Sequence, residues 1–173
     1  MDDRELMRTI RDRCLLFGEF LLRSGKTSDR YFDKYRFESD PALLQEIAAR
    51  MARLLPEGID RLAGLELGGI PLATAISIQT GIPVIFVRKK AKEYGTCNLA
   101  EGGFEAMETV AVIEDVITTA GQVIASSNDL VDLGLKIARV VCVVDREQGG
   151  TERLAEAGYD LASVYKLSEI QGA

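Results

Sequence analysis

The sequence contains no histidine, and it has only three cysteines and four prolines in 173 residues. Without histidine there can be no Ser-His-Asp triad, no His-ligated zinc and no imidazole acid–base catalysis. Any chemistry must therefore use carboxylates, Lys, Arg, Tyr, Thr and backbone amides. Cys14, Cys97 and Cys142 lack the spacing of a metal site, and their odd number favours a reducing, cytoplasmic setting.

Long apolar runs and an excess of positive charge are also absent. The longest apolar runs are about half of the ~18 residues that a membrane span requires, so we expect no membrane association. The acidic segment 1–5 lacks the apolar region of a secretory signal. The net charge is −6 and the pI is about 4.8, which counts against nonspecific nucleic-acid binding. With 47% hydrophobic and 28% charged residues, the chain is predicted to form one globular domain.

Short apolar runs alternate with helical patterns from residue 62 onward. Helical patterns fill 70–79 and 123–133, and Gly81 and Gly134 are expected to end these helices. Continuous apolar runs are typical of strands buried on both faces. The alternation predicts an α/β fold with a mainly parallel, twisted sheet flanked by helices. The predicted strands of this sheet are 62–65, 84–87, 110–113 and 140–144.

The flanking regions carry weaker patterns. An amphipathic helix is predicted at 3–17, two short strands flank a turn at 24–29, and Ser39-Asp40-Pro41 begins another helix. The tail is predicted to hold a short helix near 152–157 and a strand near 163–165. The polar stretch 88–108 is unusually long for a connection and is typical of a functional lid.

The segment 110–122 carries the strongest indication of chemistry. Its apolar strand delivers Glu114 and Asp115 at the carboxyl end, and a small-residue loop at 118–122 then leads into a helix. The free N–H groups of a helix N-terminus attract phosphate. Two carboxylates one loop away can bind vicinal hydroxyls or hold a hydrated Mg²⁺. A phosphorylated sugar is therefore an expected ligand, and the alternative is an acidic turn before an ordinary helix cap.

This segment resembles the phosphoribosyl-pyrophosphate (PRPP) motif of the type I phosphoribosyltransferases, in which four apolar residues, two acids and two apolar residues precede a Thr/Gly-rich loop. Ala120 stands where Gly is commoner, and it is unstrained if its φ is negative. Gln122 replaces the usual Thr or Ser and can still donate through its amide. The resemblance implies that Glu114 and Asp115 bind the ribose hydroxyls and contact the PRPP-bound Mg²⁺ through water. It also implies that the 5′-phosphate is held by Thr118, Thr119, Ala120, Gly121 and Gln122.

The segment 17–33 selects a family within this superfamily. Its sequence FGEFLLRSGKTSDRYFD resembles the signature F-G-x-F-x-L-x-S-G-x-x-S-x-x-Y-x-D of the orotate phosphoribosyltransferases. The resemblance implies that Arg23, at a position usually held by Lys, reaches the ligands. It also implies that Tyr31 and Phe32 flank the orotate ring, since a flat anionic ring is bound by aromatic and cationic groups. The alternative is a buried β-hairpin with both aromatic side chains in the core.

A basic cluster at 88–92 opens the long polar stretch. It resembles the catalytic loop R-K-x-x-K-x-H-G of the same family, with Tyr94 in place of the usual His and Glu101-Gly102 downstream. A cationic lid can neutralise pyrophosphate as it leaves, whereas the alternative is a solvated run of charge. The resemblance implies that PRPP is contacted here by Arg88, Lys89, Lys92 and Tyr94. The catalytic residues that it implies are Arg88, Lys89, Lys92 and Asp115.

Two further segments match the family. Leu67, Gly68 and Gly69 lie between a predicted strand and a helix; alone they indicate a turn, and the resemblance implies a pyrophosphate-binding loop. Many members carry a Lys in this loop, which this chain lacks. Arg146 follows the strand at 140–144, and the resemblance implies that it contacts orotate, as does Thr118. The alternative for Arg146 is a salt bridge at the strand end.

The resemblance covers nearly the whole chain. It implies the type I phosphoribosyltransferase fold as a single domain, 1–173. Its parts would be a small hood at about 1–38 plus the C-terminal tail, a core at about 39–150 and a mobile catalytic loop at 88–103. The implied reaction joins PRPP and orotate with Mg²⁺ to give orotidine 5′-phosphate and pyrophosphate in pyrimidine biosynthesis. The implied assembly is a homodimer in which each loop closes over the partner's site. The alternatives are a phosphoribosyltransferase for another base and a non-catalytic PRPP-binding regulator.

Overall fold

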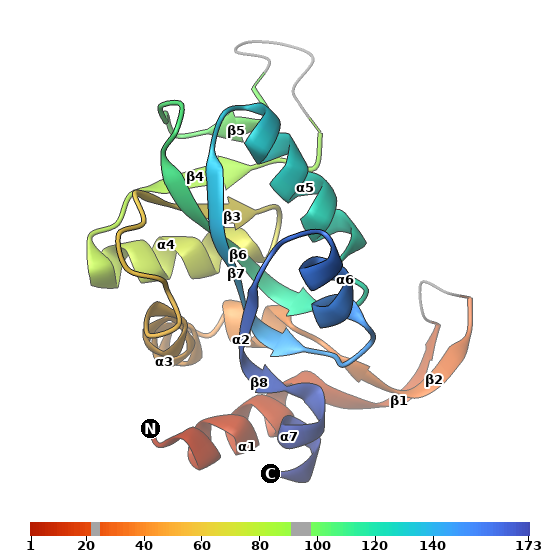
Figure 1. Ribbon diagram of the computed structural model, residues 1–173. Helices are drawn as coiled ribbons and strands as arrows, with labels where there is room; N and C mark the ends of the chain where they lie inside the picture. The colour runs from red at the N-terminus through yellow and green to blue at the C-terminus, as the bar shows by residue number, and fades with distance from the viewer. Residues whose placement is uncertain (22–24, 91–97) are drawn as a thin grey trace.

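The computed structural model describes residues 1–21, 25–90 and 98–173. Within these ranges, six strands form one sheet in the order β5-β4-β3-β6-β7-β8 (Figure 1). Only β5 is antiparallel to its neighbour, so the predicted mainly parallel α/β sheet is confirmed. The bounds are β3 Arg61–Leu65, β4 Val84–Val87, β5 Ala100–Glu101, β6 Thr109–Ile117, β7 Lys136–Asp145 and β8 Leu161–Lys166.

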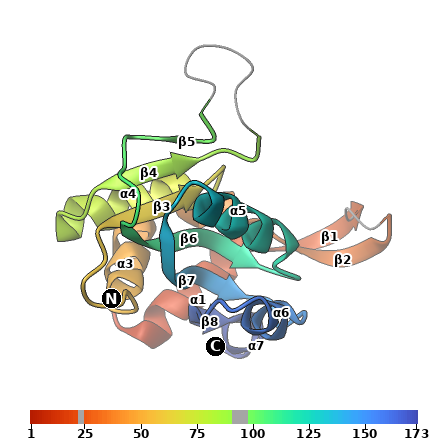
Figure 2. The ribbon, with the colours of Figure 1, turned by 45° about the horizontal axis from the view of Figure 1, so that its top comes forward.

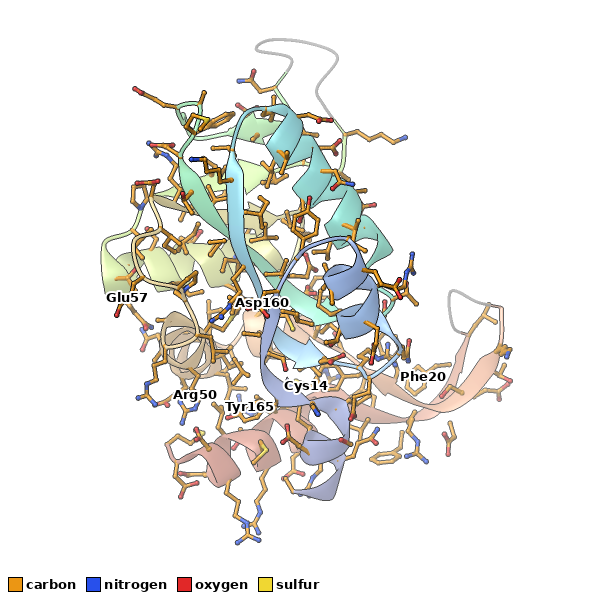
Figure 3. All side chains as sticks on the ribbon, in the orientation of Figure 1. Cys14, Phe20, Arg50, Glu57, Asp160 and Tyr165 are labelled. Carbon is orange, nitrogen blue, oxygen red and sulfur yellow. The ribbon has the colours of Figure 1, made fainter. Side chains whose placement is uncertain are left out.

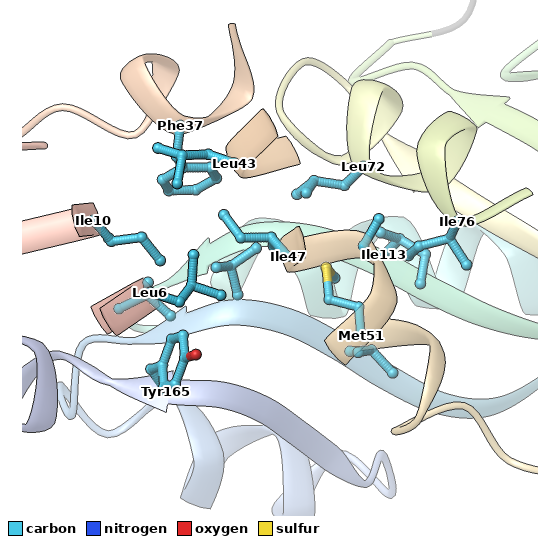
Figure 4. Packing of buried hydrophobic residues seen from close by; sticks show 14 of the residues in the cluster. Leu6, Ile10, Phe37, Leu43, Ile47, Met51, Leu72, Ile76, Ile113 and Tyr165 are labelled. Carbon is cyan, nitrogen blue, oxygen red and sulfur yellow. The ribbon is translucent and has the colours of Figure 1, made fainter. Parts of the chain in front are cut away.

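Helices cover both faces of the sheet, and the central strand supplies side chains to both. Along β6, Ala111 and Ile113 pack toward α3 (Pro41–Ala52) and α4 (Gly69–Thr80), as Figure 4 shows for Ile113. Val110 and Val112 pack toward α5 (Gly121–Asp132) and α6 (Gly150–Glu156). This alternation follows from the two-residue period of a strand, and it fixes the register of β6 between two apolar layers.

The N-terminal segment lies beside the opposite end of the chain. α1 (Asp3–Cys14) packs against α3 and against the last helix, α7 (Leu167–Gly172). Arg50 of α3 donates to Asp3 Oδ1 at 2.6 Å and to the Met1 carbonyl at 2.7 Å, and Figure 3 shows it beside Tyr165 of β8. The hairpin of β1 (Leu15–Leu21) and β2 (Thr27–Phe32) projects from the body in Figure 2, and α2 (Tyr35–Glu38) follows it.

Some predicted boundaries were wrong. The helix expected at 3–17 ends at Cys14, because Leu15 is extended and the next residues pair with β2, which leaves Phe17 74% exposed. β6 runs on through both acids to Ile117, so they lie within the strand and not after it. The short elements β5, α2 and α7 have no counterpart among the predicted ones. Gly81 and Gly134 do end α4 and α5, with φ of 77° and 90°.

No helix within the described residues has both the length and the apolar character needed to cross a membrane.

Candidate active site

The loops that follow β3 and β6 diverge at the carboxyl edge of the sheet. β3 and β6 are neighbours in the sheet. The chain runs from β3 through α4 to β4 on one side of this pair, and from β6 through α5 to β7 on the other side. In open α/β sheets, ligands bind where the strand order reverses in this way. A cavity of 330 Å³ lies there. The predicted site residues that line it are Leu67, Arg88, Lys89, Glu114 and all of 118–122.

The β6–α5 loop presents an uncapped helix N-terminus to this cavity. Ala120 occupies the N-cap position, and no side chain caps the helix there. The first N–H groups of a helix have no partner within the helix, so they are available to an anion. The Gln122 amide donates to Ser126 Oγ at 3.3 Å, which holds it along α5. The condition for an unstrained Ala120, a negative φ, is not met: its φ is +57°, in the left-handed region that Gly tolerates best.

The β3–α4 loop approaches the acids so closely that only glycine fits. The Glu66–Leu67 peptide is cis, and α4 begins at Gly69 without a side-chain cap. A Cβ on Gly68 would overlap Asp115 Oδ2 and lie 2.7 Å from Glu38 Oε1. A Cβ on Gly69 would overlap the backbone of β6. Close packing against β6 therefore requires both glycines, whatever the loop binds.

Three carboxyl groups and one ammonium meet behind this loop. Asp115 is fully buried, and its Oδ2 forms an ion pair with Lys34 Nζ, while its Oδ1 accepts from the Val116 N–H at 2.5 Å. Glu38 of α2 is 9% exposed, with its Oε1 turned toward the same place. Glu114 lines the cavity beside Lys34. The acid pair thus has one member at the cavity surface and one buried behind it.

These carboxyl groups differ in their affinity for protons. Burial raises the pKa of Glu38 to about 8, and Asp115 adds to this shift. Burial and the charge of Asp115 also raise the pKa of Glu114 well above its ordinary range. Burial acts on Asp115 in the same direction, but hydrogen bonding with Glu114 and the charge of Lys34 outweigh it and lower its pKa. Asp115 is therefore the ionised member of the group at neutral pH.

The predicted cations divide between described and undescribed residues. Arg88 and Lys89 follow β4 and line the cavity. Arg88 Nε lies 3.6 Å from Glu101 Oε1, and the Lys89 N–H donates to Glu66 Oε2 at 3.0 Å. The predictions for Arg23, Lys92 and Tyr94 fall outside the described residues.

The residues expected to contact orotate do not all face the cavity. Thr118 lines it. Tyr31 is 43% exposed and stacks near Phe20, whereas Phe32 is 8% exposed and packs in the core near Phe37. Arg146 lies at the same sheet edge, where its N–H donates to the Ile117 carbonyl at 2.9 Å. Consecutive strand residues point to opposite faces, which explains the separation of Tyr31 and Phe32.

Sequence reasoning did not assign four charged or aromatic residues of this site: Lys34, Tyr35, Glu38 and Glu66. Lys34 comes directly after the matched segment 17–33, so its position in the chain was a usable signal. Its pairing with Asp115 could not be predicted, because the two residues are distant in sequence and meet only through the fold. Glu66 was visible as an acid in a loop expected to bind anions, and it accepts a hydrogen bond from the Lys89 backbone.

Fold and site together define a type I phosphoribosyltransferase. The chain is 48% identical to an orotate phosphoribosyltransferase of a Nocardioides species over 171 residues, which cover 99% of this chain and 96% of that one. The Aeropyrum pernix orotate phosphoribosyltransferase has a TM-score of 0.86 at 28% identity, and 96% of each chain is covered. The Mycobacterium tuberculosis enzyme in complex with PRPP has a TM-score of 0.83 at 28% identity, with 97% of this chain and 98% of that one covered. The chain belongs to the orotate phosphoribosyltransferase family. No protein-family model matches the sequence.

Proposed function

We propose that this chain transfers the 5-phosphoribosyl group of PRPP to orotate, giving orotidine 5′-phosphate and pyrophosphate. The observation that carries the proposal is the uncapped N-terminus of α5 beside Glu114 at the strand-order reversal, in a chain of this family. An anion-binding helix end and a carboxyl group one loop apart suit a sugar phosphate.

The roles follow from residue type and position. Residues 118–122 bind the 5′-phosphate. Glu114 and Asp115 form the acid pair for the ribose hydroxyls, with Glu114 in the cavity lining and Asp115 buried directly behind it. The loop 67–69 binds pyrophosphate through its backbone. Arg88 and Lys89 neutralise it from the end of β4, a role supported by their place in the cavity lining, together with Lys92 and Tyr94. Orotate is selected by Arg23, Tyr31, Phe32, Thr118 and Arg146.

The chemistry asks for positioning and charge more than for proton transfer. The anomeric carbon gains positive charge as pyrophosphate departs, and orotate attacks through its ring nitrogen. Preorganised cations and N–H groups that stabilise the leaving charge lower this barrier. Arg88, Lys89 and the two helix N-termini are such groups, so a chain without histidine can support the reaction.

We also propose that the reaction requires Mg²⁺, which neutralises charge on the pyrophosphate group when bound. In the described residues there is no cluster of three or more acidic or cysteine side chains that could hold a metal alone. The site therefore suits an ion that arrives on PRPP oxygens, with Glu114 and Asp115 contacting its water shell. Cys14 and Cys142 are free, which supports the reducing, cytoplasmic setting that we propose for this chain. Burial raises the pKa of Cys14 to about 12, so its thiol is unreactive.

We propose the same division of the chain as the sequence predicts. Residues 1–38 and the C-terminal tail form a hood, 39–150 form the core, and 88–103 form the catalytic loop, of which 91–97 lie outside the described residues. The active form is a homodimer, in which Lys92 acts on the partner's site. Arg88 and Lys89 line the cavity of their own chain. The residues that the loop contributes to the partner's site are therefore those after Lys89.

Subunit complementation tests the shared loop. Lys92→Ala and Asp115→Asn homodimers should each be strongly impaired, and mixing them should restore activity, because a mixed dimer has one site with both defects and one with neither. Random pairing leaves roughly a quarter of the sites intact. Activity that stays at the parental level, despite subunit exchange shown by native mass spectrometry, would place Lys92 in its own site.

The decisive experiment for the reaction is the loss of orotate absorbance when Mg-PRPP is added. We expect turnover with orotate, none without Mg²⁺, and none with uracil, hypoxanthine, guanine or adenine. Turnover with a purine and not with orotate would refute the proposed substrate. Binding of PRPP with no turnover of any base would refute the proposed activity.

A further inference from the structure

Lys34 reaches the acid pair from outside the sheet. It lies between β2 and α2, and its backbone is fixed on both sides: the Asp33 N–H donates to the Cys14 carbonyl at 2.8 Å, and the Phe37 N–H donates to the Lys34 carbonyl at 3.1 Å. Phe37 is fully buried beside Leu43, as Figure 4 shows. The base of the Lys34 side chain is therefore anchored in the core.

The end of that side chain meets the buried acid. Lys34 Nζ pairs with Asp115 Oδ2 and lies 5.3 Å from the centre of the Tyr35 ring, and the side chain is 30% exposed and lines the cavity. Water screens an ion pair between a partly exposed ammonium and a fully buried carboxylate less than it screens a surface pair, so breaking it is costly. Removing one partner would leave the other without a compensating charge.

The Lys34 ammonium provides positive charge beside Asp115, whose other ionisable neighbours are acids. Glu38 and Glu114 are acids, and the loop at 66–69 contains no cation. Among the described residues, Lys34 is the side chain with which Asp115 forms a salt bridge. The carboxylate is also confined by Gly68, whose Cα leaves no room for a Cβ. Lys34 is therefore the group that can fix which way the Asp115 carboxylate turns.

We propose that Lys34 is a positioning residue for Asp115: its ammonium holds the buried carboxylate in the orientation that the ribose hydroxyls require, so that the N-terminal hood completes the acid pair. The inference rests on the proposed function, since it assigns Asp115 to the ribose of PRPP. It gives the segment before α2 a part in PRPP binding, separate from the contacts with orotate expected of 17–33.

The test combines charge removal, charge conservation and a double-mutant cycle. Lys34→Met should raise the KM for PRPP at least tenfold and change the KM for orotate less than threefold. Lys34→Arg should recover most of the loss, because a guanidinium keeps the charge. In the Asp115→Asn background, Lys34→Met should have less than a threefold effect, since residues that act through one another are non-additive. Lys34→Gln, which keeps a polar chain, replaces the Met variant if that variant does not fold.

Arg36→Met is the matched control. Arg36 lies in α2, two residues after Lys34, and its Nε pairs with Asp33 Oδ2 at 3.3 Å and not with Asp115, so we expect little change in either KM. Additive losses in the Asp115→Asn background, or a rise confined to the KM for orotate, would overturn the positioning role. Calorimetric binding of Mg-PRPP to each variant separates the two proposals: a wild type that binds Mg-PRPP without turning over orotate refutes the function, whereas equal binding by wild type and Lys34→Met refutes the inference.

Discussion

The two strand-to-helix loops at the active edge look alike in sequence and differ in surroundings. Both the β3–α4 loop and the β6–α5 loop join a buried strand to a helix without a side-chain cap. A Cβ on Gly68, in the first loop, would overlap Asp115 and crowd Glu38, whereas a Cβ on Gly121, at the start of α5, would meet only Arg153 Nη2 at 3.9 Å. The first loop therefore has the steric role of confining a carboxylate, and the second remains open to a ligand.

Asp115 connects the two loops, so its replacement should have the largest effect. It lies within β6, two residues before the strand ends, and its Oδ2 lies against Gly68 of the β3–α4 loop. We expect Asp115→Asn to lower kcat/KM by roughly 10²-fold or more, the scale of losing a transition-state charge contact. Steady-state kinetics with Mg-PRPP and orotate measures this. Asp160→Asn, an acid paired with Arg139 at 2.7 Å, is the control and should stay near wild type. A loss below threefold for Asp115→Asn would make that carboxylate purely structural.

Adding one methyl group to each loop tests the steric difference directly. Gly68→Ala should lower kcat/KM at least tenfold and lower Tm by several degrees, on the order of the 1–3 kcal/mol that overpacking costs. Gly121→Ala should leave Tm within about 2 °C, because its Cβ meets only an ordinary contact. Differential scanning calorimetry and kinetics on both variants make the comparison. Equal changes in Tm for the two variants would show that the loops are equally packed.

Glu38, which lies against the β3–α4 loop, should make the free energy of unfolding depend on pH. Its pKa is raised from 4.5 to about 8 in the folded state, so the folded protein holds this proton more tightly than the unfolded chain. Stability from this group is complete below pH 4.5 and is lost as the pH rises through about 8. Glu38→Gln cannot titrate, so its unfolding free energy should fall less steeply than that of the wild type between pH 5 and 9. Urea unfolding at a series of pH values measures both slopes, and parallel slopes would contradict the prediction.

Replacing Ala120, in the open β6–α5 loop, should have the smallest effect. Its φ of +57° strains an alanine by about 1–2 kcal/mol, and glycine relieves the strain but loses more entropy on folding. We expect Ala120→Gly to raise Tm by a few degrees at most, corresponding to under about 1 kcal/mol. Ala155→Gly, in the regular helix α6, should instead lower Tm. Thermal unfolding of both variants would contradict this account if both changes lowered Tm equally.

Much of the candidate site could be predicted because its signals are local. The apolar run before Glu114, the small-residue loop at 118–122 and the basic cluster at 88–92 are contiguous in the chain, and strand polarity alone brings the first two to one edge. Ala120 shows where local reasoning failed. Its backbone angle depends on how α5 leaves β6, which the residue type does not disclose.

The sequence by itself determined the class of fold, the acid pair and the family, since periodicity and motif order are properties of neighbouring residues. Tertiary structure decided three further matters: that the helix stops before Phe17 to form a hairpin, that Phe32 packs in the core while Tyr31 remains exposed, and that Lys34 pairs with Asp115. Each depends on contacts between segments far apart in the chain. Such contacts form only when burial and backbone pairing outweigh local preference, so no local pattern records them.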